Sequence, residues 1–218
     1  MRVSELEKMP NMCEACWEPA DELFDDGGTM VCRRCYEESL PAVRFERTWA
    51  MPNGRTFTIK PIRNVVRDEC LDARARGGED AVVVDPFARD SAYGTVTNDL
   101  DPDMPTDYHM DALAFLRTLD GESADLVLYD PPYSITQAAQ LYKSFGKDKL
   151  EVSVSNMAYW ARCKDECARI LKHGGVALCC GWNTNGLGKG RGFRMERVLM
   201  VAHGGSKNDT LVTVERKL

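Results

Sequence analysis

The sequence feature that most constrains the fold is a set of short apolar runs that end at acidic residues. Residues 81–85 read AVVVD, and residues 124–134 read ADLVLYDPPYS. Strands that are apolar at consecutive positions are typical of parallel sheets that are covered on both faces. Residues 61–75, 108–119 and 155–172 repeat apolar residues at helical spacing. This alternation of strands and helices predicts an α/β fold with a mainly parallel sheet.

Further segments complete the predicted layout. We expect strands at residues 56–60, 94–101 and 174–182, and a helix near residues 136–145. Residues 195–217 form two strand patterns around a turn rich in Gly, Asn and Asp, which predicts a hairpin with one antiparallel strand. In such sheets, ligands bind at the carboxyl ends of the strands. Three acids at these ends are therefore predicted to line one crevice: Asp85, Asp99 and Asp130.

The N-terminal region carries a different signal, two Cys-x-x-Cys pairs separated by 15 residues. The four thiols are those of Cys13, Cys16, Cys32 and Cys35. Two such pairs can complete a tetrahedral zinc site, and a closed set of four thiolates is typical of a structural metal rather than a catalytic one. We therefore predict a zinc-binding module over residues 1–50. It could bind DNA, bind a protein partner or brace the fold, and its acidic surroundings make DNA binding the weakest of the three.

Other sequence properties bear on location. The chain has nine cysteines, an odd number, and its first residues are charged and lack the apolar core of a signal peptide. A disulfide framework is therefore not expected. No apolar run approaches the roughly 18 residues of a membrane span. We expect a cytoplasmic protein of prokaryotic or viral origin, without a membrane segment.

Charge is distributed unevenly along the chain. Residues 1–50 contain 6 Lys or Arg and 11 Asp or Glu, residues 51–133 contain 8 and 16, and residues 134–218 contain 14 and 7. The formal net charge of −6 therefore divides into −5, −8 and +7. A basic C-terminal third predicts a face that meets a polyanion. The alternative is that these cations are ordinary solvated side chains.

The tetrapeptide at the end of the 124–129 run fits one kind of chemistry. An exocyclic amine on a nucleobase is a poor nucleophile, because its lone pair is delocalised into the ring. An enzyme that alkylates it needs acceptors for the amine protons, and Asp130 offers a carboxylate. Pro131 offers a carbonyl whose direction is restricted by Pro132. Tyr133 offers a ring on which a base taken out of a duplex can stack.

These residues resemble a known family. The sequence DPPY after an apolar strand is similar to the catalytic motif of S-adenosylmethionine-dependent DNA amino-methyltransferases, most often those that act on adenine N6. Residues 82–91, VVVDPFARDS, resemble the cofactor-binding turn of that family, and residues 57–62, FTIKPI, resemble the segment that closes over the methionine moiety. The resemblance covers roughly residues 55–218. It implies a methyltransferase domain at residues 51–218 with a Rossmann-like fold and a seven-stranded sheet.

The resemblance also implies roles for individual residues. Asp130, Pro131, Pro132 and Tyr133 would hold the target amine and base. The cofactor would contact Asp85, Pro86 and Phe87 at its methionine end, Asp99 at the ribose (with Asp101 a near alternative) and Asp111 at the adenine amine.

Two features depart from the family pattern. The glycines expected after DPF are replaced by Arg89, Asp90 and Ser91. The segment before the next strand is also short for the helix that normally follows.

Target recognition is the least defined part. Two segments are candidates, YKSFGKDK at residues 142–149 and NTNGLGKGRGFR at residues 183–194. In the second, Lys189, Arg191 and Arg194 are predicted to contact phosphates, because glycines permit close backbone approach and cations suit polyanions. The alternative is an ordinary mobile surface loop.

Three functions remain open from the sequence. The first is a DNA N6-adenine methyltransferase that uses S-adenosylmethionine and carries a structural zinc. The second keeps the fold but changes the acceptor to cytosine N4 or to adenine in RNA. The third is a non-catalytic zinc-bearing module that binds nucleic acid or protein. A homodimer is possible in each case.

Overall fold

The computed structural model describes residues 11–26, 28–35, 42–134, 136–138, 140, 157–205 and 207–218. The chain divides into two compact units, Met1–Ala42 and Val43–Leu218. The division predicted after residue 50 is therefore eight residues too late. The reason is strand β5 (Arg44–Trp49), which pairs with a strand of the large unit.

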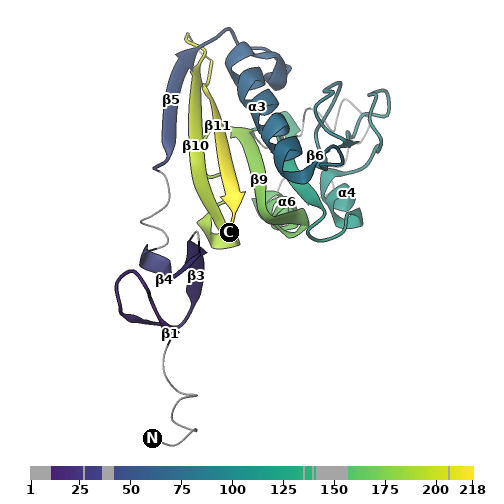
Figure 1. The fold of residues 1–218 in the computed structure, drawn as a ribbon. Helices are drawn as coiled ribbons and strands as arrows, with labels where there is room; N and C mark the ends of the chain where they lie inside the picture. Colours follow the sequence, from purple (N-terminus) through teal and green to yellow (C-terminus); the bar gives the residue numbers. More distant parts are fainter. Residues whose placement is uncertain are drawn as a thin grey trace, which may run out of the picture. The chain divides into compact units, whose positions relative to one another are not determined.

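The small unit is built from two short hairpins (Figure 1). Strand β1 (Asn11–Met12) pairs with β2 (Pro19–Ala20), and β3 (Leu23–Asp26) pairs with β4 (Thr29–Cys32). Gly28 has a φ of +94° in the second turn, a conformation that glycine adopts without steric cost. Its N–H donates to the Asp25 carboxylate at 2.6 Å, which fixes the turn.

The large unit contains one sheet of seven strands in the order β5-β10-β11-β9-β8-β6-β7 (Figure 1). Strand β11 is antiparallel to both of its neighbours, and every other pairing in the sheet is parallel. A mainly parallel seven-stranded Rossmann-like sheet with a terminal antiparallel hairpin is thus confirmed. The remaining strands are β6 (Val83–Asp85), β7 (Val96–Thr97), β8 (Ala124–Tyr129), β9 (Leu171–Gly181), β10 (Phe193–Ala202) and β11 (Thr210–Lys217).

Helices cover both faces of this sheet, as the consecutive apolar positions predict. Helix α3 (Lys60–Gly77) packs on one face, and helices α4 (Ala112–Thr118) and α6 (Met157–Ile170) pack on the other. The alternation along β8 divides its side chains between the two layers. Leu126 and Leu128 belong to the cluster under α3, whereas Val127 and Tyr129 belong to the cluster under α4 and α6.

Some predicted elements need correction. The strand expected at residues 56–60 is a 3₁₀ turn, η1 (Thr56–Thr58), and α3 begins immediately after it with Pro61 in its first turn. The strand expected at residues 94–101 is reduced to Val96–Thr97. The described residues 86–95 contain no helix, in line with the short connection noted in the sequence.

The four predicted helices have different outcomes. Those expected at residues 61–75 and 155–172 are confirmed as α3 and α6. The helix expected at residues 108–119 starts later, at Ala112. Of the helix expected near residues 136–145, residues 136–138 and 140 are helical and the rest lies outside the described residues.

Three cations of the basic C-terminal third pair with acids from earlier parts of the sequence. Lys172 pairs with Asp125 at 2.8 Å, and Lys217 lies 3.9 Å from Glu122. Arg197 binds Glu46 at 2.6 Å across the β5–β10 pair. Because these acids come from the acidic parts of the sequence, folding offsets part of the asymmetry that predicted a polyanion-binding face. Within the part of the chain that the structure describes, no helix has the length and apolar character needed to cross a membrane.

Candidate active site

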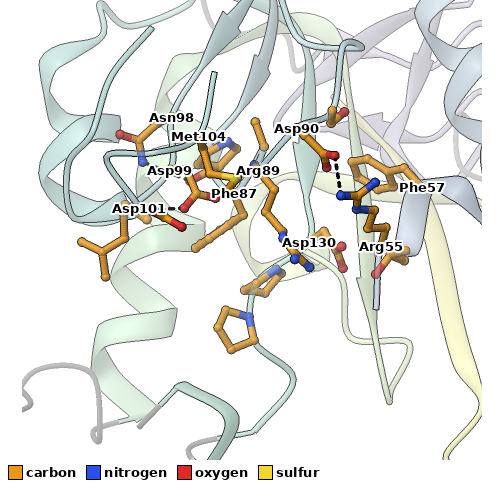
Figure 2. A pocket seen from close by; sticks show the side chains of 18 of the residues that line it. Arg55, Phe57, Phe87, Arg89, Asp90, Asn98, Asp99, Asp101, Met104 and Asp130 are labelled. Atoms are coloured by element: carbon orange, nitrogen blue, oxygen red, sulfur yellow. Dashed lines mark hydrogen bonds and ion pairs between the residues drawn. The ribbon is translucent and has the colours of Figure 1, made fainter. Parts of the chain in front are cut away.

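A cavity of about 910 Å³ opens at the carboxyl ends of β6, β7 and β8 (Figure 2). Seven of the predicted site residues line it: Pro86, Phe87, Asp99, Asp130, Pro131, Pro132 and Tyr133. They come from the three loops that follow β6, β7 and β8, which are adjacent because β6 pairs in parallel with both β7 and β8. The structure thus brings the DPF and DPPY segments together around one space.

Asp130 follows the last residue of β8 and holds the hydroxyl of Tyr133. The Tyr133 O–H donates to Asp130 Oδ1 at 2.6 Å, and the Thr56 hydroxyl lies 3.3 Å from the Tyr133 oxygen. Burial raises the pKa of the Asp130 carboxyl, and the hydrogen bond from Tyr133 opposes that shift. The backbone N–H of Tyr133 donates to Gln137 Oε1 at 2.8 Å, which fixes the turn after the two prolines. The tetrapeptide is therefore held at both ends.

Asp85 is buried behind the cavity wall and is not among the residues that line the cavity. Its side chain is fully buried, and its Oδ1 accepts a hydrogen bond from the Phe87 N–H at 3.2 Å. Its Oδ2 is buried with no hydrogen-bond partner in the described part of the chain. Burial, together with the nearby carboxylates of Asp130 and Asp99, raises the pKa of Asp85 to about 8. Such an oxygen is unusual, because a buried acceptor without a partner costs free energy.

Gly94 permits this arrangement. A Cβ at position 94 would lie 2.8 Å from Thr97 Cγ2 and 3.0 Å from the Asp85 Cβ. Any larger residue would therefore push β7 away from β6.

The turn after β6 is closed by backbone and side-chain bonds. Arg89, at one of the positions where glycine was expected, has a φ of +50°. Its N–H donates to Asp99 Oδ2 at 3.0 Å, and its guanidinium donates to the Gly54 carbonyl at 2.6 Å. Arg55 pairs with Asp90 at 3.0 Å (Figure 2). Two arginine contacts therefore tie this turn to the segment that precedes α3.

Asn98 holds the turn from the other side. Its side-chain N–H group donates to the carbonyls of Pro86 and Met110, each at 3.1 Å, and its Oδ1 accepts from the Met110 N–H at 2.9 Å. Asn98 is almost completely buried. One amide side chain thus connects the turn after β6 to the turn before α4.

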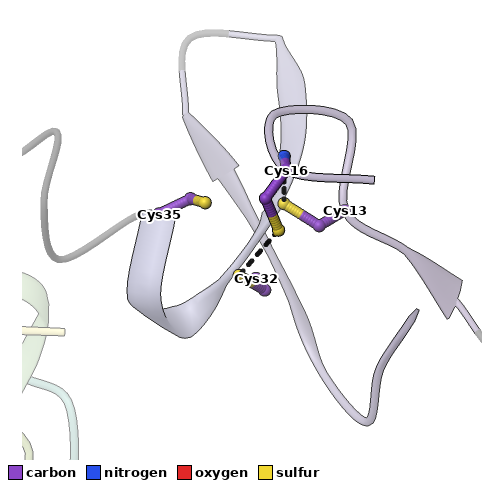
Figure 3. A group of neighbouring side chains, drawn as sticks. All are labelled: Cys13, Cys16, Cys32 and Cys35. Carbon is purple, nitrogen blue, oxygen red and sulfur yellow. Dashed lines mark hydrogen bonds between the residues drawn. The ribbon is translucent and has the colours of Figure 1, made fainter. Parts of the chain in front are cut away.

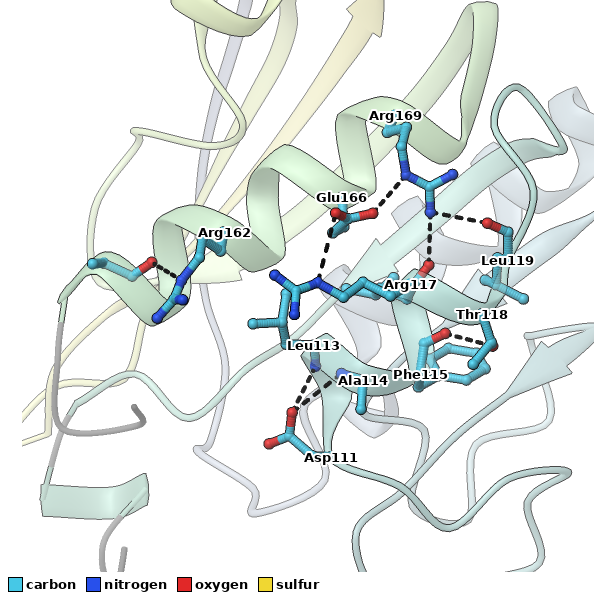
Figure 4. A network of polar contacts seen from close by, with 12 residues as sticks. Asp111, Leu113, Ala114, Phe115, Arg117, Thr118, Leu119, Arg162, Glu166 and Arg169 are labelled. Atoms are coloured by element: carbon cyan, nitrogen blue, oxygen red, sulfur yellow. Dashed lines mark hydrogen bonds and ion pairs between the residues drawn. The ribbon is translucent and has the colours of Figure 1, made fainter. Parts of the chain in front are cut away.

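Two of the predicted cofactor acids are already engaged within the protein. Asp99 lines the cavity, and its carboxylate accepts the N–H groups of Arg89 and Asp101. Asp111 caps α4, where its Oδ1 accepts from the N–H groups of Leu113 and Ala114 (Figure 4). Its Oδ2 accepts from the Tyr159 hydroxyl at 2.7 Å. Asp111 is not among the residues that line the cavity.

Two of the three cations predicted to contact phosphates at residues 183–194 have carboxylate partners within the protein. Arg191 pairs with Asp165 at 2.6 Å and also donates to the carbonyls of Leu187 and Ala161. Arg194 pairs with Glu196 at 2.7 Å. Both guanidinium groups thus have partners inside the fold, and the phosphate contacts of Lys189, Arg191 and Arg194 stay a prediction.

The position of this loop also argues against that role. Phe193 pairs with Lys217, and Val176 pairs with both Arg216 and Leu126, so β10 begins level with the start of β8. At about 3.3 Å per residue, this is roughly 16 Å below Asp130 along the strand direction. The loop therefore ends at the opposite edge of the sheet from the cavity. The other recognition candidate, residues 142–149, lies outside the described residues.

The four N-terminal cysteines converge as predicted (Figure 3). Their sulfur atoms all lie within 4.8 Å of one another. The Sγ atoms of Cys16 and Cys32 are 3.8 Å apart. That separation equals the edge of a tetrahedron with metal–sulfur bonds of about 2.3 Å, which is about 3.8 Å. The thiols are positioned to bind a metal ion, and four sulfur donors are typical of a structural zinc site.

Three cavity or rim residues were not predicted from the sequence. Arg89 and Trp160 line the cavity, and Trp160 lies 6.4 Å from the ring of Phe87. Trp182 follows β9 at the same edge of the sheet, and its ring meets that of Tyr133 edge to face at 5.8 Å. Trp182 had one signal in the sequence, an aromatic residue directly after an apolar strand. Arg89 had appeared only as a departure from the family pattern.

Comparison with known proteins gives a likeness of fold. No protein-family model matches this chain, and no curated protein matches it in sequence. Among solved structures, 1,6-didemethyltoxoflavin-N1-methyltransferase of Burkholderia thailandensis, with bound S-adenosylhomocysteine, is 14% identical with a TM-score of 0.46 and covers 70% of this chain and 77% of that chain.

Two other solved structures show a similar degree of likeness. TrmN from Thermus thermophilus is 16% identical with a TM-score of 0.45, covering 73% of this chain and 49% of that chain. N-methyltransferase NodS from Bradyrhizobium japonicum WM9 is 12% identical with a TM-score of 0.45, covering 72% and 97%. This chain thus spans about half the length of the TrmN structure. These values describe fold and give no substrate.

Proposed function

We propose that this chain is an S-adenosylmethionine-dependent methyltransferase that modifies the N6 amine of adenine in DNA. The observation that carries the proposal is the position of Asp130 and Tyr133. Both line a cavity at the carboxyl edge of a parallel sheet, and the same cavity continues to the turn after β6. A volume of about 910 Å³ is at the upper end of the roughly 300–1,000 Å³ range of ligand sites, which favours room for both a cofactor and a base.

The residues present fit the cofactor. Asp85 has a buried oxygen that lacks a partner, and a ligand ammonium group is the kind of donor that would satisfy it. Phe87 would provide an apolar wall beside the methionine end, and Asp99 or Asp101 would accept ribose hydroxyls. When bound, the cofactor supplies an electrophilic methyl group on a positively charged sulfur. The acids around this turn favour a cationic ligand over an anionic one.

The chain's own residues would then orient and activate the target amine. A carboxylate has about four acceptor positions, and Tyr133 occupies one of those on Asp130. Asp130 could therefore accept an amine N–H while it still holds the Tyr133 hydroxyl. The Pro131 carbonyl would accept the second amine hydrogen. Withdrawing both hydrogens from the plane of the base makes the nitrogen lone pair available, and fixed placement supplies much of the rate.

A direct assay tests the proposal. Purified protein is incubated with methyl-labelled cofactor and with duplex DNA, single-stranded DNA or RNA, and the products are digested to nucleosides. Label in N6-methyladenine from DNA is the expected result. Label in N4-methylcytosine or in RNA adenine would overturn the proposed acceptor and favour the alternatives of the same enzyme class.

A non-catalytic role requires a separate measurement. We expect calorimetry to detect S-adenosylmethionine binding to the wild-type protein. The absence of both binding and label transfer would favour a zinc-bearing adaptor that binds nucleic acid or protein. The fully buried carboxyl group of Asp85 and the partly buried one of Asp130 speak against that role, because binding alone gives no reason to maintain two costly groups beside one cavity.

The metal site is proposed to hold zinc in a structural role. Four cysteines leave no open position for a substrate. Metal analysis of the purified protein should give one zinc per chain, and Cys32→Ser should lower that content. An unchanged zinc content in that variant would exclude the four-cysteine site. The module's partner, DNA or protein, is not specified by these residues.

A further inference from the structure

Strand β5 forms one end of the sheet and exposes an apolar stripe. It pairs with β10 on one side, and no described strand pairs with its other side. Four large apolar side chains alternate along and beside it, namely Val43, Phe45, Trp49 and Met51, and they are 49%, 62%, 61% and 69% exposed. We call these four residues the β5 stripe. An open edge with an apolar face is a surface that proteins normally cover.

The register places the β5 stripe on one face of the sheet. Phe45 pairs with Val198, and Trp49 pairs with Ala202. The intervening β10 residues, Leu199 and Val201, belong to the cluster under α3. The stripe therefore faces away from α3. Among the described residues, the cluster under α4 and α6 includes none from β5, so those helices do not cover the stripe.

On the opposite face of β5, Glu46 already has ion-pair partners. Glu46, which lies between Phe45 and Arg47, binds Arg197 at 2.6 Å and Arg44 at 2.9 Å. Arg47 lies within the stripe, and no described residue forms an ion pair with it. The strand thus offers an apolar face, one cation and a free set of backbone donors and acceptors.

We propose that a second copy of this chain covers the free edge of β5 by pairing its own β5 antiparallel to this one, which sets the two β5 stripes side by side. An antiparallel pair of identical strands is self-complementary about a two-fold axis, so each free N–H meets a carbonyl of the other copy. At about 200 Å² for each fully exposed side chain, the four exposed fractions give roughly 500 Å² per copy. Pairing the two edges leaves the face of the sheet open, so the dimer buries the part of this area at which the two stripes contact each other, together with the paired backbone, which makes it a small interface.

Charge selects the register of this pairing. Side chains that lie directly opposite must share a face, so the two-fold axis passes through a residue and not between two residues. The two residues at the centre of β5 are 46 and 47. An axis at Arg47 would set two cations without ion-pair partners against each other. An axis at Glu46 sets Arg47 against Phe45 of the second copy, a favourable cation–aromatic contact, and Val43 against Trp49. The two Glu46 carboxylates are already neutralised by arginines, so the structure favours this axis.

The dimer is tested by mass in solution. Light scattering across a range of protein concentrations should show a dimer for the wild type. The double variant Phe45→Ser/Trp49→Ser should be a monomer with an unchanged circular dichroism spectrum. The matched control is Leu71→Ser, an exposed apolar residue on α3, which should remain dimeric. A wild type that is monomeric at every concentration, or a double variant that dimerises as well as the wild type, would overturn the proposal.

Further measurements guard against trivial outcomes. If the double variant does not fold, Phe45→Lys changes one exposed residue and should weaken the dimer, because it sets a second cation against Arg47. Dimerisation of a folded Phe45→Lys variant with wild-type strength would count against the interface. Hydrogen exchange should show protected β5 amides in the dimer. Protection in a monomeric wild type would mean that another part of the same chain covers the edge, which would also overturn the proposal.

Cross-linking tests the register. Cysteines at the residue on the two-fold axis face each other at disulfide distance. Under mild oxidation, Glu46→Cys should therefore form a covalent dimer more readily than Arg47→Cys, and both variants carry the same native cysteines. The reverse order would overturn the proposed axis at Glu46.

Discussion

Two regions of the large unit were predicted to meet the same nucleic acid, the tetrapeptide at residues 130–133 and the glycine-rich loop at residues 183–194. They end at opposite edges of the sheet, and their charged groups differ in state. At the carboxyl edge, Asp85 keeps a buried oxygen without a described partner. In the loop, Arg191 is bound by a carboxylate and two carbonyls. Whether a charged group can bind a ligand therefore depends on its neighbours in space, which its place in the sequence does not reveal.

Changing one residue in each region tests whether the two regions have these different roles. Asp130→Ala should lower the methylation rate about 10²- to 10⁴-fold, because the amine loses its proton acceptor. Its affinity for the cofactor, measured by calorimetry, should change little. Lys189→Ala in the loop should leave rate and DNA affinity unchanged. Full activity in Asp130→Ala, or a large loss of DNA binding in Lys189→Ala, would reverse the roles assigned to the two regions.

A second prediction concerns what the loop does instead. The buried Glu215 carboxylate accepts the N–H groups of Leu187 and Gly188, which anchors the loop to β11. A Cβ at Gly186, where φ is +48°, would overlap Glu215 Oε2. Gly186→Ala should therefore lower the free energy of unfolding by about 2–4 kcal/mol, through both strain and loss of these bonds.

Urea denaturation measures this effect. Gly190→Ala is the matched control in the same loop, because a Cβ there meets nothing within 4 Å. It should change the free energy of unfolding by less than about 0.5 kcal/mol. Equal stability of the two variants would mean that Glu215 does not anchor the loop. Methylation per folded molecule should be the same in both.

A third prediction concerns how the free energy of unfolding depends on pH through a buried acid at the carboxyl edge. Asp85 has its pKa raised to about 8, above its ordinary value of 3.8. Between these values the native state holds a proton that the unfolded state releases. The free energy of unfolding should therefore fall as pH rises from about 4 to about 8, by at most about 1.4 kcal/mol per pH unit from this group.

Asp85→Asn removes this titration and keeps an acceptor for the Phe87 N–H. Other buried acids, including Glu69 and Glu215, also have raised pKa values and add to the slope in both proteins. The difference between wild type and variant, measured by denaturation across this pH range without cofactor, therefore isolates Asp85. Parallel curves for the two proteins would show that Asp85 is ionised throughout.

The smallest expected effect is at Trp182, beside the tetrapeptide. Its ring meets Tyr133 edge to face and is 40% exposed. An aromatic pair of this kind contributes about 0.5–1.5 kcal/mol, so Trp182→Ala should raise KM for DNA about two- to tenfold by loosening Tyr133. kcat should change less than KM, and Trp182→Phe should restore most of the loss. A fall in kcat at constant KM would instead assign Trp182 to the chemical step.

The sequence predicted the centre of the fold better than its borders. The runs at residues 83–85 and 124–129 were recognisable because both faces of those strands are buried, which requires apolar residues at every position. Strand β5 lacks that pattern. One of its faces is exposed, and the other carries Glu46 in ion pairs, so its sequence RFERTW resembles a polar segment. It was consequently assigned to the zinc module.

The site was predictable where the chemistry is local and not where it depends on distant partners. Asp130 to Tyr133 are consecutive, and the four cysteines are recognisable by their spacing. The partners of the C-terminal cations are far away in sequence, as with Arg197 and Glu46, 151 residues apart. No local pattern encodes such a pair. The error at residues 56–60 has a local cause, since Thr, Phe and Ile favour strands but Pro61 starts a helix.

The short connection after β6 has a consequence for how much change this edge can tolerate. In the absence of a helix over residues 86–95, the turn after β6 and the turn before α4 share the single amide of Asn98. In a fold with a helix between the two turns, many contacts would share the role that Asn98 has here. Here a change that displaces one of these turns should displace the other as well. Few substitutions should therefore be tolerated in this part of the chain, and engineering of cofactor preference would best begin elsewhere.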